Sequence, residues 1–316
     1  MSIKVLAIIN PTSGKGNISN YINEIKNNLI KQDMEVDIQL TKKEYNAKNI
    51  VEDYIEGVDL LLVCGGDGTL NEVVTALMEK QVHDLTVAYI PLGTTNDLAR
   101  SLDIPIKDIS VTKRLLQSKA KVIDIGKINN ERYFCYVAAF GVITDVSYKT
   151  SQKAKNKYGR LAYYINALKE LIRIPKYKVK ISFDDEELEG EFIYGGITNS
   201  ESIAGFKWFN RNEIDLRDGK FECIFIRKPK KLSGYFRLLE AFKQKDYSWN
   251  RDIVYIQTSN IKIEINEKVP WTVDGEYAGN MDKIYIENCH EAIELAICEQ
   301  SKEKERNTNV KKSHRK

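Results

Sequence analysis

The sequence predicts a doubly wound α/β domain followed by a second domain that consists mostly of β-strands. Over residues 1–122, strand-like stretches alternate with segments that repeat apolar residues at helical spacing, which is typical of a parallel sheet with helices on both faces. From residue 123 to residue 300, strand-like stretches follow one another with only two helical interruptions. The length of 316 residues also suits two domains, because a single core rarely grows beyond about 250–300 residues.

The first domain alternates strictly between the two kinds of element. Continuous apolar or alternating stretches predict strands at residues 3–9, 34–40, 58–63 and 85–90. Helical spacing predicts helices at residues 18–32, 47–55 and 69–80, and a further helix begins at residue 96.

The second domain is rich in alternating, β-branched and aromatic stretches. They predict strands at residues 121–128, 132–140, 142–150, 176–183, 188–198, 221–227, 252–258, 261–266, 283–288 and 292–298. The acidic turn DDEE joins two of these strands in a hairpin, and helices are expected at residues 158–174 and 232–243. The spacing leaves open whether the last strands return to the first domain.

The composition indicates a globular protein of the cytoplasm. Hydrophobic residues make up 42% of the chain, and the longest apolar runs are far shorter than the about 18 residues that a membrane span needs. The first residues lack the features of a signal peptide. The net charge is only +3, and we expect no nucleic-acid partner; the basic segment 301–316 predicts a disordered tail.

Cysteine and histidine give little sign of chemistry. The five cysteines include no C-x-x-C pair, which argues against a disulfide framework or a zinc site. The three histidines have no partner at ligand spacing, so catalysis centred on histidine is not expected.

Three glycine-containing loops follow predicted strands: NPTSGKG at 10–16, GGDGT at 65–69 and PLGTTND at 91–97. Glycine allows close approach of backbone to a ligand, and the N-terminus of the next helix attracts phosphate. Because the carboxyl ends of parallel strands share one edge of a sheet, the three loops predict one nucleotide site. Each loop could instead be a tight turn, with Thr69 capping its helix. The first loop is not a Walker A motif.

The segments GGDGTLNEVV and PLGTTNDLAR resemble the soluble bacterial diacylglycerol kinases and related lipid kinases. The segments NPTSGKG, VIDIGKI, LAYYI, TNSESIAGF, RDGKF and VDGEY occur in matching order, so the resemblance extends along the chain up to the tail. GGDGT alone is shared with NAD kinases and 6-phosphofructokinases. The resemblance implies a Rossmann-like, NAD-kinase-like first domain and a β-sandwich-like second domain. It implies transfer of the ATP γ-phosphoryl group to a lipid hydroxyl, with diacylglycerol as acceptor and phosphatidic acid as product.

The resemblance also implies the residues that contact the nucleotide. They are Asn10, Pro11, Thr12, Ser13, Gly14, Thr41, Gly65, Gly66, Asp67, Gly68, Thr69, Leu70, Asn71 and Thr94. Thr41 ends a predicted strand, and without the resemblance a capping threonine would explain it equally well.

Asp67 is unexpected in a phosphate loop, because a carboxylate repels phosphate unless a cation lies between them. Hard divalent cations prefer oxygen ligands, so Mg²⁺ suits this position. The resemblance implies that Asp67, Asp97 and Asp124 hold Mg²⁺ beside ATP through water. The alternatives are helix capping for Asp97 and an ordinary strand position for Asp124.

A second, structural Mg²⁺ is implied at Asp218, together with the backbone carbonyls of Asp215 and Lys220. An ordinary D-G turn explains this segment equally well, and on the sequence alone we favour the turn. The preceding segment FKWFNRNEIDLR differs from the more usual apolar, proline-containing version in the family.

The segment WTVDGEYAG carries two carboxylates, and a lipid hydroxyl needs a base that takes its proton. The resemblance implies that Glu276 is the general base and that Asp274 is its partner. A D-G hairpin turn between two strands is the alternative interpretation.

Two predicted helices combine apolar stripes with lysine and arginine, in YGRLAYYINALKELIRIPK and RKPKKLSGYFRLLEAFKQK. Such segments can lie on an anionic membrane surface. We favour packing of each stripe against the β-rich domain, but still expect transient membrane contact somewhere, and a homodimer stays open. Other readings of the whole chain are a kinase for monoacylglycerol, a sphingoid base or phosphatidylglycerol, an NAD kinase, and a nucleotide-binding regulator without catalysis.

Overall fold

The computed structural model describes residues 2–13, 18–102, 104–105, 120–141, 175–203, 206–210 and 214–296. Several expected features therefore lie outside the described residues. They are Gly14, the strand at 142–150, the helix at 158–174 and the tail at 301–316.

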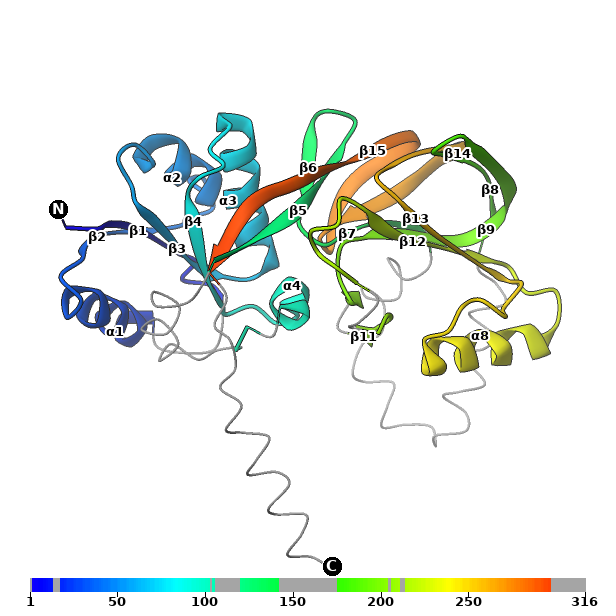
Figure 1. The fold of residues 1–316 in the computed structure, drawn as a ribbon, viewed down its shortest axis with the longest axis horizontal. Coiled ribbons are helices and arrows are strands. Elements are labelled where there is room, and N and C mark those ends of the chain that lie inside the picture. Colours follow the sequence, from blue (N-terminus) through cyan, green and yellow to red (C-terminus); the bar gives the residue numbers. More distant parts are fainter. Residues whose placement is uncertain are drawn as a thin grey trace, which may run out of the picture.

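The first lobe, residues 2–102, is a parallel sheet with helices on both faces. Its strands are β1 (Lys4–Ile9), β2 (Glu35–Leu40), β3 (Leu60–Gly65) and β4 (Thr86–Pro91), in the spatial order β2-β1-β3-β4. Its helices are α1 (Ile18–Ile30), α2 (Ala47–Tyr54), α3 (Asp67–Lys80) and α4 (Asp97–Ser101). Helix α1 covers one face, while α2 and α3 cover the other (Figure 1). This arrangement confirms the predicted doubly wound α/β domain.

The burial of each strand explains its sequence. In β1, β3 and β4, five of the six residues are buried, as expected for strands covered on both faces. Strand β2 lies at the edge of the sheet and is only partly buried, which matches its alternating sequence. Strand β1 lies between β2 and β3, so the chain extends the sheet first to one side of β1 and then to the other. Open α/β sheets bind ligands at such a reversal of strand order.

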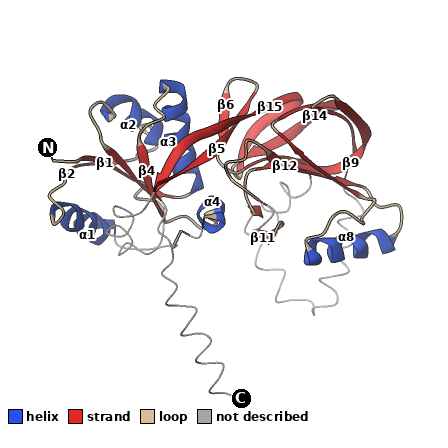
Figure 2. Cartoon of the chain, in the orientation of Figure 1, coloured by secondary structure: helices blue, strands red, loops and turns tan. Residues whose placement is uncertain are grey.

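The second lobe, residues 120–293, is built mostly from antiparallel strands, and α8 (Leu232–Gln244) is a helix on its outside (Figure 2). The long strands are β5 (Ala120–Ile128), β7 (Val137–Gly141), β8 (Tyr177–Phe183), β9 (Glu186–Thr198), β12 (Phe221–Arg227), β13 (Ile253–Thr258), β14 (Asn260–Val273) and β15 (Glu276–Ala296). The short ones are β6 (Arg132–Phe134), β10 (Ser202–Ile203) and β11 (Phe206–Lys207). The predicted hairpin of β8 and β9 is present, with Asp184 at positive φ in its turn.

Three predicted strands differ from those in the structure. The stretch 132–140 is divided into β6 and β7, and backbone N–H groups at the division bond to Asp274 instead of a neighbouring strand. The predicted stretch 283–288 and the described part of the next one, residues 292–296, belong to one strand, β15, which continues through a bulge between Cys289 and Ile293. The pattern of apolar residues is interrupted at the bulge, although the strand is not.

Strand β15 joins the two lobes into one sheet. It pairs antiparallel with β14 and β5, and its last residues, Glu294 to Ala296, pair parallel with β4. Figure 1 shows this strand running from the second lobe into the first. The described residues thereby form a 13-stranded sheet that includes both lobes.

Helix α8 was expected to pack its apolar stripe on the β-rich lobe, and the structure gives a mixed result. Tyr235, Leu238 and Ala241 are buried in that lobe. Leu232 and Phe236, however, are exposed on a second face of the same helix. The expectation was therefore right for one face and wrong for the other.

Candidate active site

The three glycine loops meet at the carboxyl ends of their strands. The backbone N–H of Asn10 donates to the Cys64 carbonyl at 2.8 Å, and the Leu92 N–H donates to the Gly65 carbonyl at 2.7 Å. The Asn10 side chain also donates through Nδ2 to Thr69 Oγ1 at 2.9 Å. The loops after β1, β3 and β4 are therefore one connected surface.

Glycine is required where two of these loops touch. A Cβ added to Gly93 would lie 2.7 Å from the Gly66 Cα atom, and one added to Gly66 would lie 3.3 Å from the Gly93 Cα atom. A Cβ on Gly65 would lie 2.6 Å from the Thr69 side chain. The backbones pack directly on each other, so no side chain can occupy this part of the loop surface.

The start of α3 has no side-chain cap. Gly66 occupies the N-cap position and has no side chain to offer. Thr69 does not cap the helix either, because its hydroxyl bonds to Asn10 instead. A helix N-terminus without a side-chain cap leaves N–H groups free to bind an anion.

Asp67, the first residue of α3, is a carboxylate in an unfavourable environment. Its Oδ1 atom is buried and has no hydrogen-bond partner among the described residues. Burial, together with the nearby charges of Asp97 and Asp274, raises the pKa of Asp67 to about 7, although the N–H groups of Asn96 and Asp97 oppose the shift. A buried carboxylate oxygen that has no partner among the described residues and feels the charge of two more carboxylates is a suitable ligand for a cation.

Asp97 comes from α4, on the loop after β4. It is fully buried, and Ser202 Oγ donates to its Oδ1 at 2.7 Å. The preceding residue, Asn96, has a φ of +49° and donates from Nδ2 to the Gly93 carbonyl at 2.9 Å. The N-cap of α4 is therefore Asn96, and the structure brings Asp97 near Asp67.

The hairpin between β14 and β15 contains the expected D-G turn. Asp274 and Gly275 are its two central residues, with φ values of +48° and +83°. Positive φ at both positions is typical of a type I′ turn, which favours this residue pair. The turn therefore explains the dipeptide, but it leaves the direction of the Asp274 side chain to be explained.

The Asp274 side chain is buried and accepts four hydrogen bonds. Three come from the backbone N–H groups of Cys135, Tyr136 and Val137, at 2.7, 3.0 and 3.0 Å. The fourth comes from Asn71 Nδ2 at 2.8 Å. Burial raises the pKa of Asp274, and these donors lower it. The carboxylate fixes the hairpin on the division between β6 and β7.

Asn71 connects the two lobes. Besides its bond to Asp274, its Nδ2 donates to the Tyr133 carbonyl at 3.0 Å. Asn71 lies on α3, while its two partners belong to the second lobe. The family resemblance grouped Asn71 with the nucleotide contacts, whereas in the structure its amide nitrogen bonds to the second lobe and holds the hairpin in place.

Glu276 is the first residue of β15 and is exposed. A Cβ added to Gly68 would lie 2.6 Å from Glu276 Oε1. The carboxylate of the second lobe therefore lies directly over the first turn of α3. Gly68 of the first lobe and Glu276 of the second lobe, which are far apart in the sequence, thus lie side by side at the glycine loop.

The remaining nucleotide candidates occupy varied positions. Thr12 donates through its N–H and its hydroxyl to Asn10 Oδ1, at 3.0 and 2.8 Å. Thr41 is buried beside the end of β1, and its N–H donates to the Ile9 carbonyl. Pro11 and Thr94 are exposed on the loops and Ser13 is partly buried. Leu70 is buried in the core, and its N–H bonds within the helix to Gly66.

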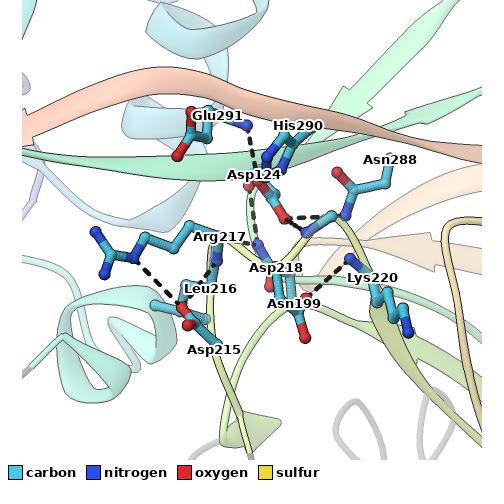
Figure 3. Close-up of polar contacts among 11 residues, drawn as sticks. Asp124, Asn199, Asp215, Leu216, Arg217, Asp218, Lys220, Asn288, His290 and Glu291 are labelled. Atoms are coloured by element: carbon cyan, nitrogen blue, oxygen red, sulfur yellow. Dashed lines mark hydrogen bonds and ion pairs between the residues drawn. The ribbon is translucent and has the colours of Figure 1, made fainter.

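Asp124 belongs to a different cluster, between β5, β15 and the loop before β12 (Figure 3). Fully buried, it accepts the N–H groups of Gly219 and Glu291, both at 2.7 Å. The Asn288 Nδ2 and His290 Nδ1 atoms lie 3.3 and 3.0 Å from its oxygens. The structure therefore places Asp124 beside the loop proposed for a structural metal, and not in the pair formed by Asp67 and Asp97.

The loop at 214–220 has the geometry of an ordinary turn. Asp218 Oδ1 accepts the N–H of Lys220 at 2.9 Å, and Asp215 Oδ1 accepts the N–H of Arg217 at 3.3 Å (Figure 3). Gly219 has a φ of +75°. In the described part of the chain, no three side chains of the types His, Cys, Asp and Glu are grouped to hold a metal ion.

Sequence reasoning gave no role to the polar segment after β9. Thr198 Oγ1 donates to the Tyr136 carbonyl at 2.6 Å, and Asn199 Nδ2 donates to the Asp124 carbonyl at 2.9 Å. Three residues after Asn199, Ser202 bonds to Asp97. The segment connects the hairpin, Asp97 and Asp124, and its run of buried polar residues, TNSES, is the signal that could have indicated this role.

A glycine-lined loop surface at the edge of a parallel sheet, faced by a carboxylate from a second lobe, is typical of a phosphotransferase. Comparison with known proteins makes the class definite. The model of the diacylglycerol kinase catalytic domain matches residues 4–128. The model of the YegS C-terminal NAD kinase beta sandwich-like domain matches residues 137–295.

Individual relatives agree. The diacylglycerol kinase of Staphylococcus carnosus (strain TM300) is 32% identical over 293 residues, which cover 91% of this chain and 93% of that protein. The diacylglycerol kinase of Bacillus subtilis (strain 168) is 29% identical over 281 residues, which cover 88% and 91%. The crystal structure of a diacylglycerol kinase from Bacillus anthracis str. Sterne has the same fold, with a TM-score of 0.72, 24% identity and coverage of 93% and 96%. The chain belongs to the diacylglycerol kinase family and is a lipid kinase.

Proposed function

We propose that this enzyme transfers the γ-phosphoryl group of ATP to a hydroxyl of diacylglycerol, with Mg²⁺ as cofactor, and forms phosphatidic acid. The observation that supports it most directly is the position of Glu276 Oε1 over Gly68. This geometry places a carboxylate beside the loop surface that suits phosphate. The relatives named as diacylglycerol kinases support the choice of acceptor.

The nucleotide would bind on the loops after β1, β3 and β4. The uncapped start of α3 suits a phosphate group, and the contact between Gly66 and Gly93 holds the loops after β3 and β4 together beside it. The loops are connected by Asn10, which bonds to both the β3 end and Thr69. Phosphoryl transfer needs alignment and charge neutralisation more than covalent catalysis, and rigid loops provide alignment.

The residues near Asp67 fit a divalent cation. A bound Mg²⁺ would neutralise phosphate charge, and the buried oxygen of Asp67 would hold it, with Asp97 close by. A cation there would also keep Asp67 ionised against the effect of burial. For the structural Mg²⁺, the proposed ligands stay Asp218 and the carbonyls of Asp215 and Lys220, on a loop that Asp124 holds through Gly219.

Glu276 is the proposed general base. A lipid hydroxyl has a very high pKa, so its proton must leave as the new P–O bond forms. Glu276 is exposed at the loop surface and can accept this proton. Asp274 is buried and fully engaged in hydrogen bonds, so its role is to fix the turn that carries Glu276.

The acceptor could also be monoacylglycerol, a sphingoid base or phosphatidylglycerol, because apolar pockets discriminate weakly among lipids. NAD is tested beside these lipids, because the GGDGT motif alone does not distinguish lipid kinases from NAD kinases. Membrane contact and a homodimer remain proposals that belong with this function.

Transfer of labelled phosphate from ATP to a panel of lipids and NAD, with Mg²⁺ or EDTA, tests the function. We expect phosphatidic acid to form only with Mg²⁺. In Glu276→Gln, we expect kcat to fall by a factor of about 10²–10⁴, because the base is lost, while the Kd for ATP changes little.

Glu189→Gln is the matched control, because Glu189 is exposed on β9 in the far part of the second lobe. It should retain the parent kcat. Phosphorylation of NAD and not of lipid would contradict the proposed acceptor. Full turnover by Glu276→Gln would contradict the proposed base.

A further inference from the structure

Helix α8 has an inner face that packs and an outer face that does not. On the inner face, Phe242 packs edge-on against Trp208, with ring centroids 4.8 Å apart, and Leu238 is buried. The outer face carries three large apolar side chains: Leu232, Phe236 and Leu239 are 52%, 63% and 62% exposed. The packing of α8 on its own lobe therefore leaves these three side chains exposed to solvent.

The three exposed side chains form one stripe. Residues 232, 236 and 239 are four and three positions apart, which places them on the same side of a helix. Single exposed leucines are common on protein surfaces and need no explanation. A row of two leucines and a phenylalanine on one helix face is different, because contiguous exposed apolar surface is typical of an interaction site.

The charge around the stripe indicates the partner. The segment 227–245 contains seven Lys and Arg residues and one acidic residue, Glu240. Arg237 is paired with Asp252 at 3.1 Å, whereas Lys230, Lys231 and Lys243 are exposed beside the stripe. Basic side chains that border an apolar stripe match a surface with anionic headgroups over an apolar interior.

The same charge argues against two other occupants. In a second copy of the chain, the same face would bring lysine-rich edges together. The segment 153–176, the other amphipathic stretch of this chain, has seven Lys and Arg residues and one Glu, so its charge has the same sign. Like charges at close range oppose both associations, whereas an anionic membrane attracts this face.

The position of helix α8 relative to the candidate active site also suits a docking surface. In Figure 1 it lies below the strands of the second lobe, on the same side of the sheet as α4, which carries Asp97. We propose that the outer face of α8, formed by Leu232, Phe236 and Leu239 with Lys230, Lys231 and Lys243, docks the enzyme on an anionic membrane surface. This rests on the proposed function, since an acceptor dissolved in a bilayer gives the docking its purpose.

Cosedimentation with vesicles tests the docking separately from catalysis. The vesicles are phosphatidylcholine alone or mixed with phosphatidylserine, and no ATP is present. The triple variant L232S/F236S/L239S should lower the partition coefficient by about tenfold or more, because apolar area is lost. The variant K230Q/K231Q should lower binding to the anionic vesicles by about fivefold per lysine, and should leave the weak binding to neutral vesicles unchanged.

Helix α1 and Lys31, the residue that follows it, supply matched controls. Ile30→Ser removes an apolar side chain that is 51% exposed, and K26Q/K31Q removes two exposed charges in the first lobe. Both should bind vesicles like the parent. Circular dichroism checks that every variant is folded, and all of these residues are exposed, so folding should be retained.

Activity then separates the two proposals. The α8 variants should lose kcat/KM on diacylglycerol in anionic vesicles and keep it on a short-chain diacylglycerol presented in detergent. Unchanged vesicle binding by the α8 variants would overturn the docking surface, and so would a parent dimer that the triple variant converts to monomer without loss of vesicle binding. If the parent phosphorylates no lipid while α8-dependent binding is present, the docking holds and the proposed function fails.

Discussion

At the scale of single residues, Gly68 is one of the points at which the two lobes meet at the site. It lies in the first turn of α3, and the carboxylate of Glu276 occupies the space that a side chain at this position would need. Gly66 and Gly93 have a different function, because each leaves room for the other's backbone. Glycines of one loop system are thus required for two separate physical reasons.

Gly68→Ala tests the first reason, which is that the Glu276 carboxylate needs the space beside Gly68. The new Cβ would meet the far end of the flexible Glu276 side chain, which can move away at little cost to stability. We expect the Tm to stay close to that of the parent, while kcat falls at least about tenfold because the base is displaced.

Gly93→Ala is the contrasting variant. Its Cβ would meet the backbone of Gly66 at 2.7 Å, so the loops must shift and the affinity for ATP should fall. Melting curves, kcat and nucleotide binding measure these effects. Parent-like turnover by Gly68→Ala would show that the position of Glu276 over Gly68 has no part in catalysis.

At the scale of elements, Asp124 holds a loop and a bulge together. One of its oxygens accepts the N–H of Gly219 in the loop at 214–220, and the other accepts the N–H of Glu291 in the bulge of β15. Glu291 has a φ of +47°, and the strand register shifts across this bulge. A buried carboxylate can satisfy several backbone donors at once, which explains why it is found where two irregular elements meet.

Asp124→Ala should therefore destabilise the protein. Two backbone N–H groups would lose a charged acceptor in partly buried hydrogen bonds, at about 1.5–3 kcal/mol for each bond. Urea denaturation measures the change in the free energy of unfolding. Asp185→Ala, in the exposed turn between β8 and β9, is the control and should stay within about 0.5 kcal/mol of the parent. A parent-like stability of Asp124→Ala would show that water replaces the carboxylate.

At the scale of the whole molecule, β15 determines how the lobes depend on each other. It starts at the proposed base, pairs with β14 and β5 in the second lobe, and ends beside β4 in the first. A side-chain hydrogen bond adds to this pairing, since the Thr86 hydroxyl of β4 donates to Glu294 of β15. Because backbone pairing continues through both lobes, neither lobe has an independent edge at this boundary.

We expect the two lobes to unfold in one transition. The three tryptophans, Trp208, Trp249 and Trp271, all lie in the second lobe, so their fluorescence reports on that lobe alone. Far-UV circular dichroism reports on both, and the two midpoints should coincide.

Leu295→Ala gives a sharper version of this test. Leu295 is buried where β15 pairs with β4, and its truncation should cost about 2–5 kcal/mol. Both midpoints should shift together to lower denaturant. A shift in circular dichroism without a matching shift in tryptophan fluorescence would show that the lobes unfold separately.

The sequence predicted the fold class and the place of the loops, because both depend on local patterns. The period of the apolar residues separates strands from helices, and glycines after buried strands such as β3 mark the ligand edge of a parallel sheet. The D-G turn at Asp274 was also readable from the sequence, since the turn type itself requires these residues. The family resemblance then added roles for individual side chains.

Other features could not be read from the sequence. The spacing of apolar residues predicts a helix with an apolar stripe. It does not show which apolar residues are buried, and α8 exposes Leu232 and Phe236 while it buries Leu238. Two carboxylates that look alike in the sequence, Asp97 and Asp124, lie in different clusters because their neighbours come from different strands.

By itself, therefore, the sequence determined the alternation of elements, the turn chemistry and the edge of the sheet that suits phosphate. Only the tertiary structure decided which carboxylate faces the loop surface, which one fixes a turn and which one holds the bulge. The physical reason is distance along the chain: Asn71 and Asp274 are 203 positions apart and still share a hydrogen bond. Local preferences act over a few residues, whereas the environment of a buried carboxylate is created by segments that meet only when the chain has folded.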